Sequence, residues 1–203
     1  MASLAQAKEV LQKDPVMRRI IHIEIDVPFF DGDVNAYLYS SIISQQLSTK
    51  AADAIYSRFL NHFDGNSPSP DQLLAVDFES LRSLGLSNAK VRYISNVAEH
   101  FKTNSVEPQH WHKKSNDQII KELTAIKGVG VWTVQMVLIF CLARRDVFPI
   151  LDLGVRNSAI DLYNLTGEKQ KINQQLLEIA EAWRPFRSFA SLYLWRWRNL
   201  GMS

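Results

Sequence analysis

Two glycines separated by a single residue, Gly128 and Gly130, constrain the fold of this chain more than any other feature. They lie within Leu123-Thr-Ala-Ile-Lys-Gly-Val-Gly-Val-Trp-Thr-Val-Gln-Met-Val-Leu138, which predicts a helix ending near Ala125, a tight turn, and a second helix beginning near Val131. Glycine permits unusual backbone dihedral angles and a close approach by another molecule. The first N–H groups of the second helix, with the positive end of its dipole, would then form a phosphate site. The segment fits a simple turn between two packed helices equally well.

The rest of the chain predicts an all-α protein. Ser69 precedes Pro70, a residue favoured at the first position of a helix, and Ser115 followed by Gln118 has the spacing of a capping box. Strand-like alternation is confined to Ile21–Ile25. The helices predicted from apolar spacing begin after Ser48, Ser69, Ser87 and Ser115, and cover Lys169–Trp183 and Arg187–Arg198.

The composition excludes several classes of protein. A single cysteine, Cys141, excludes an internal disulfide and a four-cysteine zinc or iron–sulfur site. The longest apolar stretch, Val134–Ala143, is shorter than the roughly 20 residues that span a bilayer, and Met1–Lys13 lacks the features of a secretory signal. The formal net charge of +2 permits a nucleic-acid partner without requiring one, so any DNA contact must be local. We therefore expect a soluble, cytoplasmic protein (nucleoid-associated if bacterial) with no membrane partner.

A second pattern surrounds Asp152. Pro149 keeps the residue before it extended, and Asp152 then precedes a helix with Val155, Ala159 and Ile160 at helical spacing. Aspartate is among the best helix N-caps, which stabilise a helix by about 1 kcal/mol. The local pattern by itself favours a cap over a catalytic carboxylate, but one residue can serve in both roles.

The two patterns together resemble the signature of the helix-hairpin-helix (HhH-GPD) DNA glycosylase superfamily, in which Gly-x-Gly is followed downstream by Pro-x-x-Asp-Leu-Gly. Three further segments extend the match: Ser41–Ala52, Gly85–Lys90, and Trp183–Ala190 with Trp195. The resemblance covers Val34–Leu200, nearly the whole chain, and its nearest branch is the DNA-3-methyladenine glycosylase II, or AlkA-like, type.

This resemblance implies a base-excision repair enzyme that hydrolyses the N-glycosidic bond of an alkylated base, with Asp152 as the catalytic residue. Breaking this bond develops positive charge on the sugar, which a nearby carboxylate stabilises. A helix N-terminus favours the ionised carboxylate. Bases of the 3-methyladenine and 7-methylguanine type are already cationic, so they leave with little help from a general acid, and water is the final nucleophile. Hypoxanthine, ethenoadenine and uracil remain open as further substrates.

Relatives that also cleave the DNA strand carry a lysine directly after Gly-x-Gly-x, and this lysine forms a Schiff base with the sugar. Trp132 holds that position here, while Lys127 precedes the glycines and is expected to face the backbone or solvent. The resemblance therefore implies a monofunctional glycosylase that leaves an abasic site, requires no cofactor and has no iron–sulfur cluster.

The resemblance assigns the base pocket to Trp132, Met136 and Trp195. Flipping a base out of the duplex costs a few kcal/mol, and stacking on an aromatic ring contributes roughly 1–3 kcal/mol in return. A cationic base adds cation–π attraction. Met136 stands where some relatives have tyrosine, so we expect a pocket of different shape and selectivity. Tryptophans are more often core residues, and the core is expected for the other three: Trp111, Trp183 and Trp197.

The hairpin is expected to bind the DNA backbone without reading its sequence, through Gly128, Gly130, Val131 and Thr133. Val134 occupies a place where alanine is usual, a conservative departure that is expected to loosen the helix crossing. Relatives also bind Na⁺ or K⁺ at the hairpin, bridging to a DNA phosphate. The corresponding ligands here are three backbone carbonyls: those of Thr124, Ile126 and Val129.

Two further candidates for DNA contact lie outside the hairpin. Gln46 falls in the loop that carries the intercalating residue in this family, where its side chain would fill the gap left by the flipped base and bond to the orphaned opposite base. A helix-terminal glutamine that faces solvent fits nearly as well. Arg144 and Arg145 fit either phosphate contacts or a solvated helix end.

The resemblance implies an all-α, two-lobed helix-hairpin-helix glycosylase fold in a single domain, residues 1–203, with the active site in the cleft between the lobes. One lobe would comprise residues 34–143 and end in the hairpin at about 117–140, and the other would combine residues 1–33 with 144–203. Asp152 and the hairpin would face each other across the cleft. We expect a monomer that binds double-stranded DNA containing a damaged base. A non-catalytic helix-hairpin-helix DNA-binding protein and a helical protein-interaction scaffold remain as alternative hypotheses.

Overall fold

The structure is a computed structural model that describes residues 4–104 and 108–201. Every regular element in these ranges is helical, which confirms the all-α prediction. The alternating segment Ile21–Ile25 forms turns and irregular chain instead of a strand. Its backbone bonds locally here, since the Ile20 and Ile21 N–H groups both donate to the Met17 carbonyl, at 2.9 and 3.1 Å.

The helices fall into two compact units. Unit 1 combines the N-terminal segment through Phe30 with the segment that begins at Leu138, and unit 2 is the continuous stretch Asp31–Val137. The chain returns from unit 2 to unit 1 within continuous helix, where α9 (Val131–Met136) is followed by one turn of π-helix, η2 (Val137–Cys141). Within the described ranges, no helix has the length and hydropathy needed to span a bilayer.

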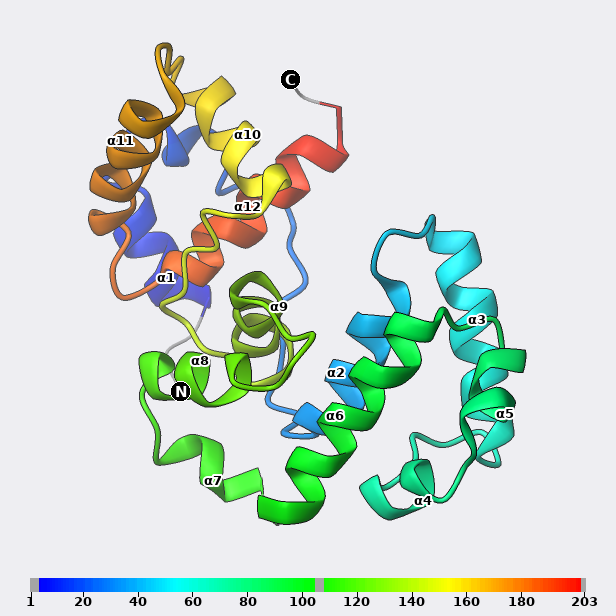
Figure 1. Ribbon diagram of the computed structural model, residues 1–203. Coiled ribbons are helices and arrows are strands. Elements are labelled where there is room, and N and C mark those ends of the chain that lie inside the picture. The colour runs from blue at the N-terminus through cyan, green and yellow to red at the C-terminus, as the bar shows by residue number, and fades with distance from the viewer. Residues whose placement is uncertain (1–3, 105–107, 202–203) are drawn as a thin grey trace. The chain divides into compact units, whose positions relative to one another are not determined.

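Unit 2 is built from eight helices of the described chain. These are α2 (Val34–Ser44), α3 (Thr49–His62), α4 (Pro70–Leu74), α5 (Phe78–Ser83), α6 (Asn88–Asn104), α7 (Pro108–His112), α8 (Asn116–Thr124) and α9. Helix α6 packs against α2, α4 and α5, and α8 packs against α9 (Figure 1). The helices that were predicted to begin after Ser48, Ser69 and Ser115 do so: Ser48 accepts the Ala51 N–H, and both Ser69 and Ser115 form capping boxes, the latter as its spacing predicted. Trp111 is buried, as predicted.

Unit 1 is arranged around its last helix. Its elements are α1 (Leu4–Leu11), the 3₁₀ turn η1 (Met17–Arg19), η2, α10 (Leu153–Leu162), α11 (Lys169–Glu181) and α12 (Arg187–Asn199). Helix α12 packs against α10 and α1, and α10 packs against α11 (Figure 1). Every residue of α12 from Ser188 to Leu194 is buried, so this helix forms the centre of the unit's core. Trp183 and Trp197 belong to that core, which confirms their predicted place.

Asp14 ties the N-terminal segment to the rest of unit 1. Its carboxylate accepts hydrogen bonds from the Val16 N–H at 2.8 Å, from the Trp183 indole at 3.0 Å, and from the Tyr163 hydroxyl. Burial raises the pKa of Tyr163, and the hydrogen bond and charge of Asp14 raise it further. The environment of Tyr163 therefore favours the protonated hydroxyl, which is the form that donates to Asp14.

Candidate active site and nucleic-acid interface

Asp152 is the N-cap of α10, as its position after Pro149 predicted. Its Oδ1 atom accepts the Val155 N–H at 2.9 Å and the indole N–H of Trp195, on α12, at 2.8 Å. N–H donors and the positive end of a helix dipole are the partners that an ionised carboxylate prefers. The neighbouring Leu151 and Leu153 are 60% and 70% exposed, so an apolar rim borders the half-buried carboxylate. The structure thus places Trp195, predicted as a pocket aromatic, directly against Asp152.

Gly154 leaves the space in which Trp195 and Asp152 meet. A Cβ atom at this position would lie 3.0 Å from Cδ1 of Trp195 and 3.1 Å from Oδ1 of Asp152, closer than ordinary van der Waals contact. The ring of Phe140 packs against Trp195 with a centroid separation of 5.4 Å. The glycine of the Asp-Leu-Gly pattern therefore has a local role, which is to let the indole reach the carboxylate.

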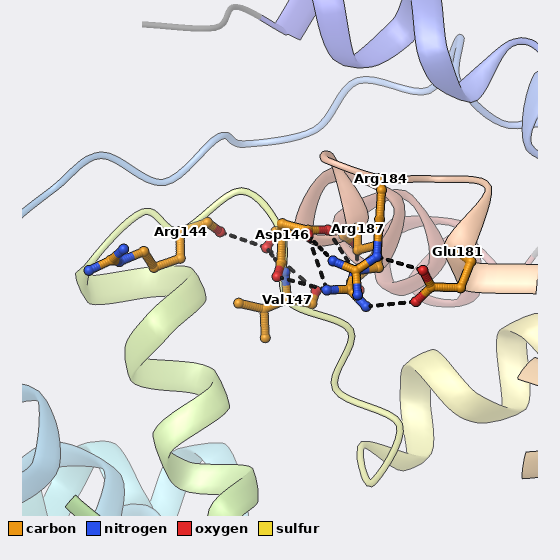
Figure 2. Close-up of polar contacts among 8 residues, drawn as sticks. Arg144, Asp146, Val147, Glu181, Arg184 and Arg187 are labelled. Atoms are coloured by element: carbon orange, nitrogen blue, oxygen red, sulfur yellow. Dashed lines mark hydrogen bonds and ion pairs between the residues drawn. The ribbon is translucent and has the colours of Figure 1, made fainter. Parts of the chain in front are cut away.

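Ion pairs attach the loop before Asp152 to the first residue of α12 (Figure 2). Arg187 donates to the Asp146 carboxylate from Nε at 2.5 Å and from Nη2 at 3.0 Å, and Arg184 donates to it at 2.7 Å. Arg184 also bonds to Glu181 at 2.7 Å, and this hydrogen bond lowers the pKa of the Glu181 carboxyl. Two arginines and two carboxylates thus form one network at this end of the loop.

Ser188 adds a second attachment for the same loop. Its hydroxyl donates to the Arg144 carbonyl at 2.6 Å and accepts the Val147 N–H at 3.0 Å. The Arg144 side chain points away from this network in Figure 2, and burial lowers the pKa of its guanidinium. Helix α12 therefore holds the loop at both ends, since Trp195 holds the other end at Asp152.

Sequence reasoning missed the roles of Arg187 and Ser188. The signal was present, because both residues lie in the Trp183–Ala190 segment that extends the family match. Their partners are 41 to 44 residues away along the chain, and no spacing rule pairs residues at such separations.

The hairpin forms where it was predicted, with α8 ending at Thr124 and α9 beginning at Val131. Gly128 has a φ of 103°, in the left-handed region that favours glycine, and an added Cβ would lie 2.3 Å from the Tyr93 ring. Gly130 differs, since its φ is −93° and an added Cβ would meet no atom within 4 Å beyond Gly130 itself and its two chain neighbours. The fold of unit 2 itself requires Gly128, whereas Gly130 leaves open space beside the first turn of α9.

The side chains of α9 divide sharply by exposure. Val131 and Trp132 are 42% and 38% exposed, whereas Thr133 and Met136 are 3% and 6% exposed. A DNA contact from Thr133 would therefore use its backbone N–H, one of the first-turn donors that have no acceptor within the helix. Val134, in the place where alanine is usual, is fully buried.

Trp132 lines a pocket together with the turn that follows α2. This pocket has a volume of about 390 Å³ and is lined by Ser41, Ser44, Gln45, Gln46 and Trp132. Gln46 is exposed and adopts a positive φ of 59°. Unit 2 therefore brings together the residue predicted to stack on the base and the residue predicted to enter the duplex.

The three carbonyls predicted to bind a cation belong to the end of α8 and the hairpin turn. The side chains of Ile126 and Val129 are buried, which anchors the turn, and the Ile126 carbonyl accepts the Val129 N–H at 3.0 Å. Asn96 of α6 donates to the Lys127 carbonyl at 2.9 Å, so α6 also holds this turn. Carbonyls at a helix C-terminus carry partial negative charge, and oxygen ligands suit hard cations. Among the residues described, no three His, Cys, Asp or Glu side chains gather to form a metal site.

The sequence from residue 39 to residue 182 matches the model of the HhH-GPD superfamily of base excision DNA repair proteins. The chain belongs to the HhH-GPD superfamily. This finding confirms the resemblance drawn from the hairpin and the Pro-x-x-Asp-Leu-Gly pattern, and the matched range contains both.

Similar proteins in this superfamily share most of their length with this chain. DNA-3-methyladenine glycosylase 1 of Schizosaccharomyces pombe is 38% identical over 165 residues, which are 80% of this chain and 72% of the relative. DNA-3-methyladenine glycosylase of Saccharomyces cerevisiae is 28% identical over 206 residues, covering 93% of this chain and 68% of the relative.

Solved structures agree with this assignment. The crystal structure of a DNA-3-methyladenine glycosidase from Bacillus halodurans superposes with a TM-score of 0.84 at 32% identity, covering 99% of this chain and 91% of that one. The S. pombe enzyme Mag1 in complex with abasic DNA superposes with a TM-score of 0.82 at 31% identity, covering 98% of each chain. The all-helical fold is therefore that of the HhH-GPD glycosylases.

Proposed function

We propose that this chain is a base-excision repair DNA-3-methyladenine glycosylase that hydrolyses the N-glycosidic bond of alkylated bases, 7-methylguanine included, and leaves an abasic site. The observation that carries the proposal is Asp152 at the N-cap of α10, with the Trp195 indole on its Oδ1 atom, in a member of the HhH-GPD superfamily. Relatives named as 3-methyladenine glycosylases, which match over most of the chain, support the choice of substrate.

Double-stranded DNA containing a damaged base binds first through the hairpin. Gly128 shapes the turn, and the open space at Gly130 leaves room for a phosphate to approach the first-turn N–H groups of α9, those of Val131 and Thr133 among them. Such contacts position the duplex without reading its sequence. In this proposal the enzyme acts as a monomer in the cytoplasm, associated with the nucleoid if it is bacterial.

The damaged base then leaves the stack. Gln46 enters the gap from the rim of the pocket that it shares with Trp132. Trp132 and Trp195 offer aromatic faces to the flipped base, where a cationic purine gains cation–π attraction, and the buried Met136 supports this part of α9.

Bond cleavage relies on the carboxylate. As the bond between C1′ and the base nitrogen breaks, its electron pair passes to the base, which leaves as neutral 3-methyladenine, and positive charge develops on the sugar. Asp152 stabilises this charge, and the hydrogen bonds from Val155 and Trp195 hold its Oδ1 atom in place. Water adds to C1′ and loses a proton, which completes the abasic site.

Strand cleavage is not part of the proposed activity. The lyase mechanism needs a lysine amine in the second helix of the hairpin, where this chain has Trp132. Lys127 is exposed and precedes Gly128, and its carbonyl is held by Asn96. No cofactor and no iron–sulfur cluster is required for hydrolysis in this proposal.

A Na⁺ or K⁺ ion at the hairpin completes the proposal. The backbone carbonyls of Thr124, Ile126 and Val129 would hold it, and the ion would supply positive charge for a DNA phosphate beside the turn. The buried side chains of Ile126 and Val129 fix the turn, so the carbonyls need no large rearrangement to bind the ion.

The test compares Asp152→Asn with wild type on duplex DNA containing a single alkylated base, with abasic sites revealed by alkali. Asparagine keeps the N-cap, so the fold and DNA binding are retained. We expect the rate of base release to fall by about 10²–10³-fold, the usual cost of losing one electrostatic stabiliser. Asp77→Asn is the matched control, because Asp77 caps α5 by the same contact, Oδ1 to the Ser80 N–H at 2.9 Å, and should release base at the wild-type rate.

The outcomes separate the proposal from its rivals. Base release that survives in Asp152→Asn would refute the assigned mechanism. Cleavage by wild type without alkali would refute the monofunctional assignment. Salt-sensitive duplex binding without release of any alkylated base would favour a non-catalytic DNA-binding protein.

A further inference from the structure

The turn that follows α2 holds Gln46 in a conformation that is unusual for glutamine. Gln45 has φ −52° and ψ 134°, Gln46 has φ 59°, and the Leu47 N–H donates to the Ser44 carbonyl at 3.3 Å. These values are typical of a type II β-turn, whose third residue favours glycine or asparagine because its φ is positive. Glutamine has a Cβ atom that disfavours this region, so neighbouring groups must stabilise the turn.

Lys90, in the first turn of α6, supplies this stabilisation. Its ammonium group donates to the Ile43 carbonyl at 2.7 Å and to the Gln45 carbonyl at 2.8 Å. Both carbonyls lie at the C-terminal end of α2, where donors from within the helix are lacking and a positive charge is favourable. One cation thus satisfies two acceptors at the point where the chain leaves α2.

The place of Lys90 in its own helix indicates that its role lies outside that helix. The Lys90 N–H donates to Ser87 Oγ at 3.3 Å, which puts Lys90 in the first turn of α6. A cation at a helix N-terminus opposes the dipole. Burial also lowers the pKa of the Lys90 ammonium group, so its environment disfavours the charge unless the two carbonyls compensate.

The Gln45 carbonyl belongs to the peptide group between the second and third residues of the turn. Types I and II differ mainly in the orientation of this peptide. Rotation to type I would turn the Gln45 carbonyl away from Lys90 and give Gln46 a negative φ. We infer that Lys90 is a positioning residue that locks this peptide in the type II orientation and so directs Gln46 to the pocket lined by Trp132.

We call this restraint of the Gln45–Gln46 peptide by Lys90 the lock. A double-mutant cycle that measures Tm tests the lock without reference to activity. The variants are Lys90→Met, Gln46→Gly and the double mutant. Without Lys90 the wild-type turn can rotate to type I and so relieve the strain at Gln46, whereas glycine adopts a positive φ at little cost and has no such strain to relieve. Lys90→Met should therefore lower Tm less in wild type than in Gln46→Gly, by about 2–4 °C in a chain of this size. Equal losses in the two backgrounds would refute the lock.

Lys102→Met is the matched control for this cycle. Lys102 lies on the same helix and pairs with Asp71 at 2.7 Å on the exposed surface, so its loss removes the same charge. It should shift Tm equally in both backgrounds. A coupling of Lys102 to Gln46 as large as that of Lys90 would also refute the lock, because the effect would then be one of net charge.

The consequence for catalysis rests on the proposed function. Lys90→Met should lower the single-turnover rate of base release by about tenfold, equivalent to about 1.4 kcal/mol, and leave the salt dependence of binding to undamaged duplex unchanged. Lys90→Arg should restore most of the rate, since a guanidinium donates to two carbonyls, and Lys102→Met should match wild type.

These outcomes distinguish failure of the inference from failure of the function. If wild type releases no base, the proposed function fails, and the thermal cycle still decides whether Lys90 locks the turn. If wild type is active and Lys90→Met releases base at the same rate, Lys90 does not position Gln46 for catalysis.

Discussion

Helices α12 and α6 each support two segments of the candidate site, but their main contacts differ in kind. In unit 1, α12 bonds chiefly to side chains: Arg187 binds the Asp146 carboxylate, and Trp195 donates to the Asp152 carboxylate. Ser188 is the exception on α12, because it bonds to the backbone of the same loop. In unit 2, α6 bonds to the backbone. A side-chain pair fails when either partner changes, whereas support of the backbone depends only on the residue that provides it.

The contacts of α6 show what support of the backbone permits. Lys90 and Asn96 donate to backbone carbonyls in the Gln46 turn and in the hairpin, and Tyr93 packs against Gly128, which has no side chain. The residues that are held remain free to vary in sequence, with Gly128 as the exception. The main contacts of α12 therefore require a particular residue type in each partner. The contacts of α6 mainly determine the path of the backbone that they hold.

The largest effect is expected where α6 meets a position that tolerates no side chain. Gly128→Ala should lower the free energy of unfolding by about 2–5 kcal/mol, because alanine disfavours φ 103° and its Cβ would overlap Tyr93. Gly130→Ala should cost less than about 1 kcal/mol, since its Cβ meets open space. Thermal and urea unfolding measure both. Equal losses would mean that the two glycines do not differ in the way the structure indicates.

The next effect tests the side-chain contact made by α12. Trp195→Phe keeps an aromatic ring but removes the hydrogen bond to Asp152, and hydrogen bonds to charged groups contribute about 1.5–3 kcal/mol. We expect base release to slow by about 10–100-fold at saturating DNA.

Two controls isolate that hydrogen bond. Trp197→Phe, in the same helix but in the core, should lower stability and leave the rate per folded molecule unchanged. Trp195→Phe should add little further loss in the Asp152→Asn background, where the charge is already absent. A full additional loss there would show that Trp195 acts on the base instead of the carboxylate.

The smallest effect concerns the pH dependence of stability that arises from His100 on α6. Burial lowers the pKa of His100, on α6, and the nearby Glu122 carboxylate opposes this shift. Because the folded state binds the proton less tightly than the unfolded state, His100 favours folding above its ordinary pKa of about 6.5, and this contribution is lost as the pH falls further. Thermal unfolding at pH 7.5 and 5.5 should show a modest loss of Tm, smaller than that caused by Gly128→Ala.

Replacing His100 tests whether it is the source of the difference in Tm between the two pH values. His100→Gln should reduce the difference in Tm between the two pH values, and His62→Gln, at an exposed position on α3, should leave it unchanged. Equal slopes in wild type and His100→Gln would assign the pH dependence to other groups.

The features that local spacing predicted are those in which neighbours in sequence bond to each other. Ser69 and Ser115 cap their helices within three residues, and Asp152 bonds to the Val155 N–H three residues on. The hairpin is likewise formed by residues that lie close together in the sequence. Short-range hydrogen bonds of this kind can be predicted from the spacing of residue types along the sequence.

The supporting contacts could not be predicted in this way. Lys90 bonds to the Ile43 carbonyl 47 residues away, and every residue type carries a carbonyl, so position 43 gives no signal. Arg187 and Asp146 are 41 residues apart, and their charges could pair with many others. The family match marked the segments that contain Lys90 and Arg187, but only the packing of α6 and α12 identifies their partners.

The insertion of unit 2 within unit 1 determines the order in which the ribosome can deliver a working protein. Asp14 bonds to Tyr163 and Trp183, 149 and 169 residues further along the chain. Since synthesis proceeds at about 5–20 residues per second, the first helix emerges many seconds before its partners and has no core to join in that interval. The continuous segment Asp31–Val137 is complete much earlier. A nascent chain therefore completes the hairpin before it reaches Asp152, and the proposed catalytic site in unit 1 is assembled last.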